Sequence, residues 1–417
     1  MSEFVRRHNK AIVWTFRILV GAVFIVSGTT KMIDVWGFIY KIEQYLNVWS
    51  WPQPRSLVLV VAMGLSAVEF LTGWFLITGC YKRTCVWIMS LTMLGMLPLT
   101  FYIAVANPVS DCGCFGDFLL ISNTATFIKN VVISAMLVYL LFHNRGVDGL
   151  FSAYSQWLVG FVALIYIIVI GLFGYNIQPL VDFRPYKEGT ALLSDRNDEE
   201  EGEWRFIYEK DGESREFGED ELPDSTWTFV DRVEPERVNV AEERTLAVFD
   251  GDEDVTGEVI ATDGIQVMVL IPEMKNLDAS STYLINDMNR YVMSLGGEMI
   301  AILGSDSRGV EFWRDFSMAS YDIYTAEDTS LKELARGNVS VVYLKDGVIV
   351  WKRSLSSIDS DWFATADGNA LDMLTYSGTF LFWLLTVLFL GAEAVIWGID
   401  RSGRAVKLHF SRRNRKK

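Results

Sequence analysis

Residues 84–106 read TCVWIMSLTMLGMLPLTFYIAVA, and residues 111–117 read Asp-Cys-Gly-Cys-Phe-Gly-Asp. A second apolar run starts at Phe118, so the short polar stretch lies between two segments long enough to cross a bilayer. The stretch holds two of the four cysteines, one residue apart. Gly113 and Gly116 allow the backbone to turn tightly around the sulfurs. We therefore expect a fold organised around a cysteine loop held by membrane helices.

Apolar residues make up 51% of the 417 residues and gather in runs of about 20, the length that crosses a hydrocarbon core of roughly 30 Å. The runs predict six spans, at about 11–30, 57–79, 84–106, 118–142, 151–174 and 377–398. The first run is interpreted as a retained span, because no small-residue cleavage site follows it. The lipid bilayer is thus the first expected partner.

Charge divides the chain into two parts. Residues 175–375 hold 43 Asp and Glu against 18 Lys and Arg, a net charge of −25, whereas the remainder carries +10. The acidic part lacks the basic surface of a nucleic-acid-binding protein. The N-terminus, the loop at 80–85, the loop after the fourth span and the basic tail at 399–417 all carry Lys or Arg. With six spans these segments fall on one side, so both termini are expected in the cytoplasm.

The cysteine loop and residues 175–375 are then expected outside the cytoplasm. Residues 34–45 predict an amphipathic helix on the outer membrane surface, with Trp49 and Trp51 in the interfacial aromatic belt. Residues 175–263 form an acidic β-rich linker in which Trp204–Tyr208, Ser214–Phe217 and Thr226–Val230 predict strands. Asp211-Gly212 predicts a hairpin turn between the first two strands.

Residues 264–355 predict an α/β domain. Strands are expected at 265–271, 298–304, 322–325, 339–344 and 348–352, and helices at 277–295, 307–317 and 329–336. This order implies a mixed sheet with helices on its faces. The domain contains no cysteine, so it is expected to bind a partner and not to perform dithiol chemistry.

Cys112 and Cys114 are the candidate reactive residues. A thiolate is the nucleophilic form of cysteine, and a helix N-terminus or a cation favours it. The fourth span is predicted to start after Asp117, a candidate N-cap, and to carry Lys129 and Asn130 near the loop. A redox pair, a structural disulfide and two buried free thiols all remain open. A metal site is not expected, because the three histidines fall on the cytoplasmic side of this topology.

Other candidates lie within or beside the spans. Cys80 and Cys85 form either the far end of an electron path across the membrane or inert filler. Glu69 and Arg17 are intramembrane candidates, because ionisable residues are expensive in lipid. They form either a structural ion pair or a ligand or proton site.

Two family resemblances follow from these motifs. Residues Arg17 to Gly21, with Phe24, Ser27-Gly28 and Lys31, resemble the first-helix pattern of DoxX-like membrane proteins. The stretch 111–117 with Lys129-Asn130 is similar to the motif of MauE, the methylamine-utilisation membrane proteins. These families imply an extracytoplasmic thiol–disulfide role for Cys112 and Cys114, with a quinone as the implied carrier. Asp111, Gly113, Phe115, Gly116, Asp117, Lys129 and Asn130 are the implied supporting residues.

The α/β domain resembles thioredoxin-like domains in element order, although Asn338-Val339 stands where that family has a proline before the last hairpin. The layout with Asp182 to Tyr186 between the two parts resembles a larger DoxX-like family of bacterial membrane proteins. The sequence therefore predicts a multi-domain protein: an α-helical transmembrane bundle plus a periplasmic α/β thioredoxin-like domain, in the bacterial inner membrane. Its expected function is thiol–disulfide exchange with an extracytoplasmic protein partner, and the alternative is a non-catalytic scaffold with a structural disulfide.

Overall fold

The computed structural model describes residues 3–109, 112–193, 205–210, 213–218, 226–233, 246–274, 279–304, 307–365 and 369–414. Asp111, Trp204, Asp211 and Gly212 of the sequence predictions lie outside these residues. The chain divides into two compact units, which we describe separately. The first unit comprises residues 1–184, 335–340 and 352–417, and the second comprises 185–334 and 341–351.

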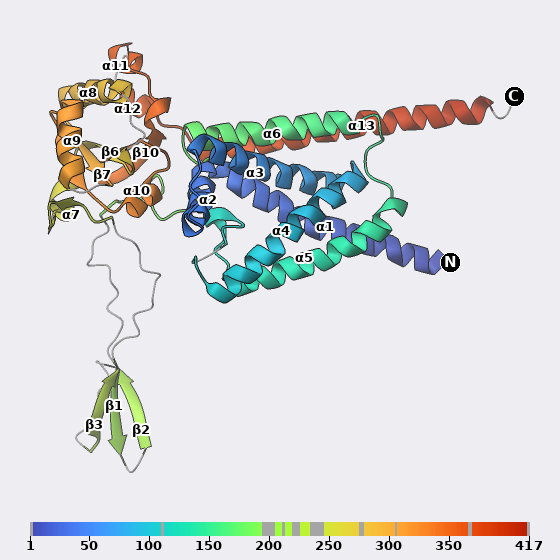
Figure 1. The fold of residues 1–417 in the computed structure, drawn as a ribbon, viewed down its shortest axis with the longest axis horizontal. Helices are drawn as coiled ribbons and strands as arrows, with labels where there is room; N and C mark the ends of the chain where they lie inside the picture. The colour runs from blue at the N-terminus through green and yellow to red at the C-terminus, as the bar shows by residue number, and fades with distance from the viewer. Residues whose placement is uncertain are drawn as a thin grey trace. The chain divides into compact units, whose positions relative to one another are not determined.

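The first unit is a helical bundle (Figure 1). Its main helices are α1 (Glu3–Ile33), α2 (Val35–Val48), α3 (Arg55–Thr78), α4 (Lys82–Ala106), α5 (Asn123–His143), α6 (Gln156–Asn176) and α13 (Gly378–Asn414). Short helices α11 (Asp361–Thr365) and α12 (Ala370–Met373) precede α13. Within the described residues, six helical segments are long and apolar enough to cross a membrane, as the sequence predicts. The last of these, Ala370–Ala405, extends beyond the predicted end of the sixth span.

Glycines bring α1 and α3 into close contact. A Cβ on Gly28 would lie 2.5 Å from the backbone nitrogen of Phe70, and one on Gly73 would lie 2.7 Å from the carbonyl oxygen of Gly21. Side chains larger than hydrogen would therefore push the helices apart, as at other small-residue interfaces between membrane helices. This close packing brings polar side chains of α1 next to α3.

The predicted amphipathic helix is present as α2. The Asp34 side chain caps it by accepting a hydrogen bond of 2.8 Å from the Gly37 backbone N–H. Trp36 and Ile39 are buried in a cluster that includes Phe70 of α3 and Ile167 of α6. The apolar face of α2 thus packs against the bundle, and its position at the outer membrane surface stays a prediction.

The second unit contains a seven-stranded mixed sheet in the order β10-β9-β6-β7-β8-β4-β5. Its strands are β4 (Phe249–Asp250), β5 (Glu253–Asp254), β6 (Ile265–Ile271), β7 (Glu298–Leu303), β8 (Asp322–Thr325), β9 (Ser340–Lys345) and β10 (Val348–Ser354). Its helices are α7 (Thr256–Val259), α8 (Ala279–Ser294), α9 (Ser307–Ser317) and α10 (Asp328–Leu334). Strands β6, β7 and β8 are parallel, and β4 pairs antiparallel with β8.

Helices α8 and α9 contact each other beside the sheet (Figure 1). Strands β6, β7 and β8 are neighbours in sequence order, and the right-handed crossover that is usual for parallel strands places both connecting helices on the same face of the sheet. The unit also holds a three-stranded antiparallel sheet of β1 (Arg205–Lys210), β2 (Glu213–Gly218) and β3 (Thr228–Val233), in the order β2-β1-β3. Lys210 pairs with Glu213, which confirms the predicted hairpin between the first two strands.

Candidate functional site

The cysteine loop owes its shape to two glycines with left-handed backbone angles. Gly113 has φ of 69° and Gly116 has φ of 55°. The Gly116 N–H donates to the Gly113 carbonyl at 3.2 Å, and a single 3₁₀ turn, η1 (Gly116–Phe118), follows. A Cβ on Gly113 would also lie 2.8 Å from Cγ of Lys41. Glycine at 113 is therefore required both for backbone angle and for space.

The two cysteine sulfurs are in contact. Cys112 Sγ and Cys114 Sγ lie 3.2 Å apart as thiols, one donating a hydrogen bond to the other. Cys112 is 8% exposed and packs with Ile103 and Val109, whereas Cys114 is half-buried. The Tyr45 hydroxyl donates to the Cys112 carbonyl at 3.1 Å and fixes the backbone between α2 and the loop. This separation suits attack of one sulfur on a group attached to the other.

The electrostatic surroundings make the two thiols different. The hydrogen bond from Cys112 lowers the pKa of Cys114 from 9.0 to about 6; burial opposes this shift, and Lys129 and Lys31 support it. The same hydrogen bond, together with burial, raises the pKa of Cys112 well above its ordinary value. These surroundings favour the thiolate at Cys114 and the neutral thiol at Cys112.

A buried ion pair lies beside the loop. The Lys31 ammonium of α1, 5% exposed, donates to both carboxylate oxygens of Glu69 on α3 at 2.8 Å. The Ser27 hydroxyl accepts from Lys31 at 3.1 Å and lies within hydrogen-bond distance of the Cys114 carbonyl (2.7 Å) and Glu69 (2.8 Å). These contacts connect the loop backbone to the α1–α3 pair.

Arg17 does not pair with Glu69, so that alternative from the sequence is wrong. Its guanidinium donates to the Asn144 side chain at 2.6 Å and to the backbone carbonyls of Asn144, Val147 and Asp148 at 3.0–3.2 Å. Fourteen residues separate Arg17 from Lys31 in α1, which is about 21 Å along a helix. Arg17 thus holds the connection after α5 at the other end of the span.

Lys129 and Asn130 of α5 have different surroundings. The Lys129 ammonium lies 4.3 Å from the centre of the Phe115 ring, a cation–π contact that joins α5 to the loop. Asn130 is buried and donates to the Thr100 hydroxyl of α4 at 3.3 Å. Lys129 is therefore the member of this pair that contacts the loop, and Asn130 joins two helices.

Arg336 was missed by sequence reasoning. It belongs to the segment 335–340, which follows α10 in the chain but is part of the first unit. Its guanidinium is buried and bonds the Asp34 carboxylate at 2.8 and 2.9 Å, and it also bonds Asp117 of the cysteine loop. Burial lowers the pKa of Arg336, but the two carboxylates outweigh it and raise that pKa above the ordinary value.

Asp117 is consequently an ion-pair partner and not the N-cap of α5. The helix begins five residues after the predicted start, and Ser122 caps it by accepting from the Ala125 N–H at 3.4 Å. The only sequence signal for Arg336 was a charged residue just before a buried strand, which is not specific.

Cys80 and Cys85 are buried in different apolar clusters. The Cys85 thiol donates to the Thr72 carbonyl at 2.9 Å. Burial raises the pKa of Cys80 to about 11, which disfavours its thiolate. These surroundings favour inert packing for both thiols over the proposed electron path.

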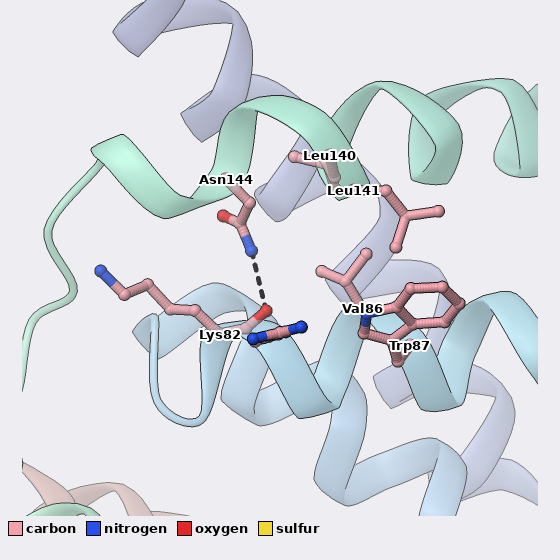
Figure 2. Close-up of a pocket in the computed structure, with 7 residues that line it drawn as sticks. Lys82, Val86, Trp87, Leu140, Leu141 and Asn144 are labelled. Atoms are coloured by element: carbon pink, nitrogen blue, oxygen red, sulfur yellow. Dashed lines mark hydrogen bonds between the residues drawn. The ribbon is translucent and has the colours of Figure 1, made fainter.

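A hollow lies between the start of α4 and the end of α5 (Figure 2). It is a shallow, open hollow of about 260 Å³ including the solvent at its mouth, and it is lined by Lys82, Arg83, Val86, Trp87, Leu140, Leu141 and Asn144. In Figure 2 the Asn144 amide donates to the Lys82 carbonyl, at 3.0 Å. The cysteine loop joins the opposite ends of these two helices, so this hollow is not beside the thiols.

Comparison with known families agrees with this arrangement. Residues 9–143 match the family model described as methylamine utilisation protein MauE. These residues resemble MauE. The match contains both loop cysteines, Lys31, Glu69 and Lys129 but ends long before Arg336.

Residues 202–235 match a domain of unknown function, DUF8463. No curated protein and no solved structure matches the chain. The chain thus combines a region similar to MauE, six candidate membrane spans and a further unit with a mixed sheet.

Proposed function

We propose that this chain exchanges disulfides with an extracytoplasmic protein through Cys112 and Cys114. The observation that carries the proposal is the contact of two thiols at 3.2 Å, of which Cys114 has its pKa lowered to about 6. A thiolate with a neighbouring thiol is the minimal equipment for dithiol exchange. Lys31 and Lys129 provide the positive charge that stabilises the thiolate.

The reaction proceeds in two balanced steps. The Cys114 thiolate attacks one sulfur of a substrate disulfide, whose S–S bond breaks as the mixed disulfide forms, and the released substrate thiolate takes up a proton. Cys112 then loses its proton and attacks the Cys114 sulfur, which releases the second substrate thiol and leaves a Cys112–Cys114 disulfide. Two electrons pass from the pair to the substrate; the reverse sequence oxidises a substrate dithiol.

A quinone is the carrier that the DoxX-like resemblance implies. The hollow between α4 and α5 does not fit that role for this pair, because its lining belongs to the opposite ends of both helices and includes no residue of the cysteine loop. In the proposed reaction the pair exchanges electrons directly with protein thiols.

The proposal places the protein in the bacterial inner membrane, with both termini in the cytoplasm and the cysteine loop and residues 175–375 in the periplasm. The distribution of Lys and Arg supports this orientation. The α/β domain, interpreted as thioredoxin-like without its cysteine pair, would dock the protein substrate. Methylamine appears only in the name of the matched family and defines no substrate here.

Trapping the mixed disulfide tests the proposal. In a Cys80→Ser/Cys85→Ser background, Cys112→Ala removes the resolving thiol, so substrate proteins should accumulate on Cys114 as adducts that reductant releases. The matched Cys114→Ala variant retains only Cys112, which is 8% exposed and less accessible than Cys114, and should trap less. Absence of adducts from Cys112→Ala at normal protein level would contradict the exchange reaction.

The second candidate is a membrane scaffold whose cysteines form a structural disulfide. The burial of Cys112 and the bond from Tyr45 to its carbonyl favour a role in shaping the loop. The double Cys112→Ser/Cys114→Ser variant distinguishes the two. Exchange predicts normal protein level with lost function, and the scaffold predicts lost stability or no effect.

A further inference from the structure

We propose that the hollow between α4 and α5 binds the phosphate group of an anionic phospholipid. This site is independent of the cysteine chemistry and lies at the opposite ends of these two helices. The hollow combines positive charge, neighbouring apolar side chains and a position at the ends of two candidate spans.

The lining supplies two cations and no carboxylate. The Lys82 ammonium donates one hydrogen bond, at 2.8 Å to the Val147 carbonyl, and retains two further N–H donors. Arg83 is exposed and makes no hydrogen bond or ion pair with any residue that the structure describes. Asp148 is an exposed acid whose backbone carbonyl accepts a hydrogen bond from Arg17, and it is not among the residues that line the hollow. Two adjacent cations with unused donors suit a phosphate.

The start of α4 adds to this positive potential. The helix has no acidic residue in its first turn and no side-chain cap on its first N–H groups. The partial positive charge of a 25-residue helix therefore adds to the charges of Lys82 and Arg83. The Asn144 side chain does not cap the first N–H groups of α4, because its oxygen accepts from Arg17 and its amide nitrogen donates to the Lys82 carbonyl.

The apolar half of the hollow favours a lipid over a free phosphate. Val86 and Trp87 of α4 lie opposite Leu140 and Leu141 of α5 (Figure 2). Trp87 is 59% exposed, which is typical of an aromatic residue at a membrane–water boundary. A phospholipid would place its phosphate at the two cations and its acyl chains against Trp87 and Leu141, because Val86 and Leu140 are buried in the bundle. Basic pockets at the ends of membrane helices take anionic head groups in this way.

The test uses the purified full chain in a neutral detergent, titrated with phosphatidylglycerol, phosphatidylcholine or inorganic phosphate, with the thermal unfolding midpoint as the readout. We expect phosphatidylglycerol alone to raise the midpoint. Arg83→Gln should weaken the apparent Kd about fivefold, the effect of one basic residue near an anionic head group. Arg83 makes no described contact, so this variant should fold normally.

Arg401→Gln is the matched control. Arg401 is an exposed arginine near the end of α13 and lies 5.5 Å from the ring centre of Trp397, one turn earlier. It should leave the apparent Kd unchanged. The proposal is overturned if phosphatidylcholine stabilises equally, if inorganic phosphate alone reproduces the effect, or if Arg83→Gln and Arg401→Gln bind phosphatidylglycerol alike.

Discussion

Removal of the Cys112 thiol should raise the pKa of Cys114. The hydrogen bond from Cys112 is the largest cause of the shift from 9.0 to about 6, so Cys112→Ala should return the pKa toward 9.0. At pH 7 the thiolate fraction would fall from about 90% to about 1%. Nucleophilicity rises with pKa, by about 20-fold over three units at a Brønsted coefficient of about 0.45. The two effects leave only about a fivefold lower alkylation rate at pH 7.

The pH at half-maximal reactivity is therefore a better readout than the rate. The assay is alkylation of the full chain in lipid nanodiscs by iodoacetamide, from pH 4 to pH 10, followed by mass spectrometry of the loop peptide in a Cys80→Ser/Cys85→Ser background. The lowered pKa means that reactivity is lost as the pH falls through about 6. Cys112→Ala should move this midpoint upward. A midpoint above 8 with both thiols present, or one that Cys112→Ala leaves unmoved, would refute the reasoning.

Three further predictions concern the stability of the helical unit. Arg336→Met leaves the Asp34 and Asp117 carboxylates without their buried guanidinium and should lower the free energy of unfolding by about 3–5 kcal/mol. A denaturant titration measures this loss, and Arg336→Lys should recover part of it. Unchanged stability would contradict the ion-pair assignment. Burial raises the pKa of Asp182, but Arg184 and Lys352 outweigh it and lower that pKa to about 2. Stability should thus fall between about pH 4 and pH 2, a loss that Asp182→Asn should not show in acid unfolding. Gly28→Val should force α1 from α3 and lower the thermal midpoint, whereas the uncrowded Gly95→Val should have less effect.

The α/β sheet was well predicted because its strands are short continuous apolar runs. Strand β6 spans residues 265–271, as predicted. Strands β7 (298–303) and β10 (348–354) start at the predicted residues and end within two residues of the predicted ends. Strands β4 and β5 were missed, because two residues each give no periodic signal. The start of α5 was placed too early, because Phe118–Ile121 is apolar enough to extend the predicted span.

The geometry of the candidate site was less accessible. The cysteine pair and Lys129 stand out as unusual residues in or beside membrane segments. Lys31 can pair with Glu69 only because of the way α1 and α3 are turned about their own axes. The close contact at Gly28 sets this rotation, and a hydropathy pattern does not reveal it. Arg336 reaches Asp117 across 219 residues of sequence, so no local pattern predicts that contact.

The most direct test of thiol exchange is the oxidation state of Cys112 and Cys114 in living cells. Cells expressing the Cys80→Ser/Cys85→Ser chain would be quenched in acid and alkylated, before and after treatment with a mild reductant. Exchange predicts a mixed population of dithiol and disulfide that shifts when the reductant is added. A pair that is fully oxidised under all conditions and resists the reductant would be a structural disulfide, and the account of exchange would be wrong.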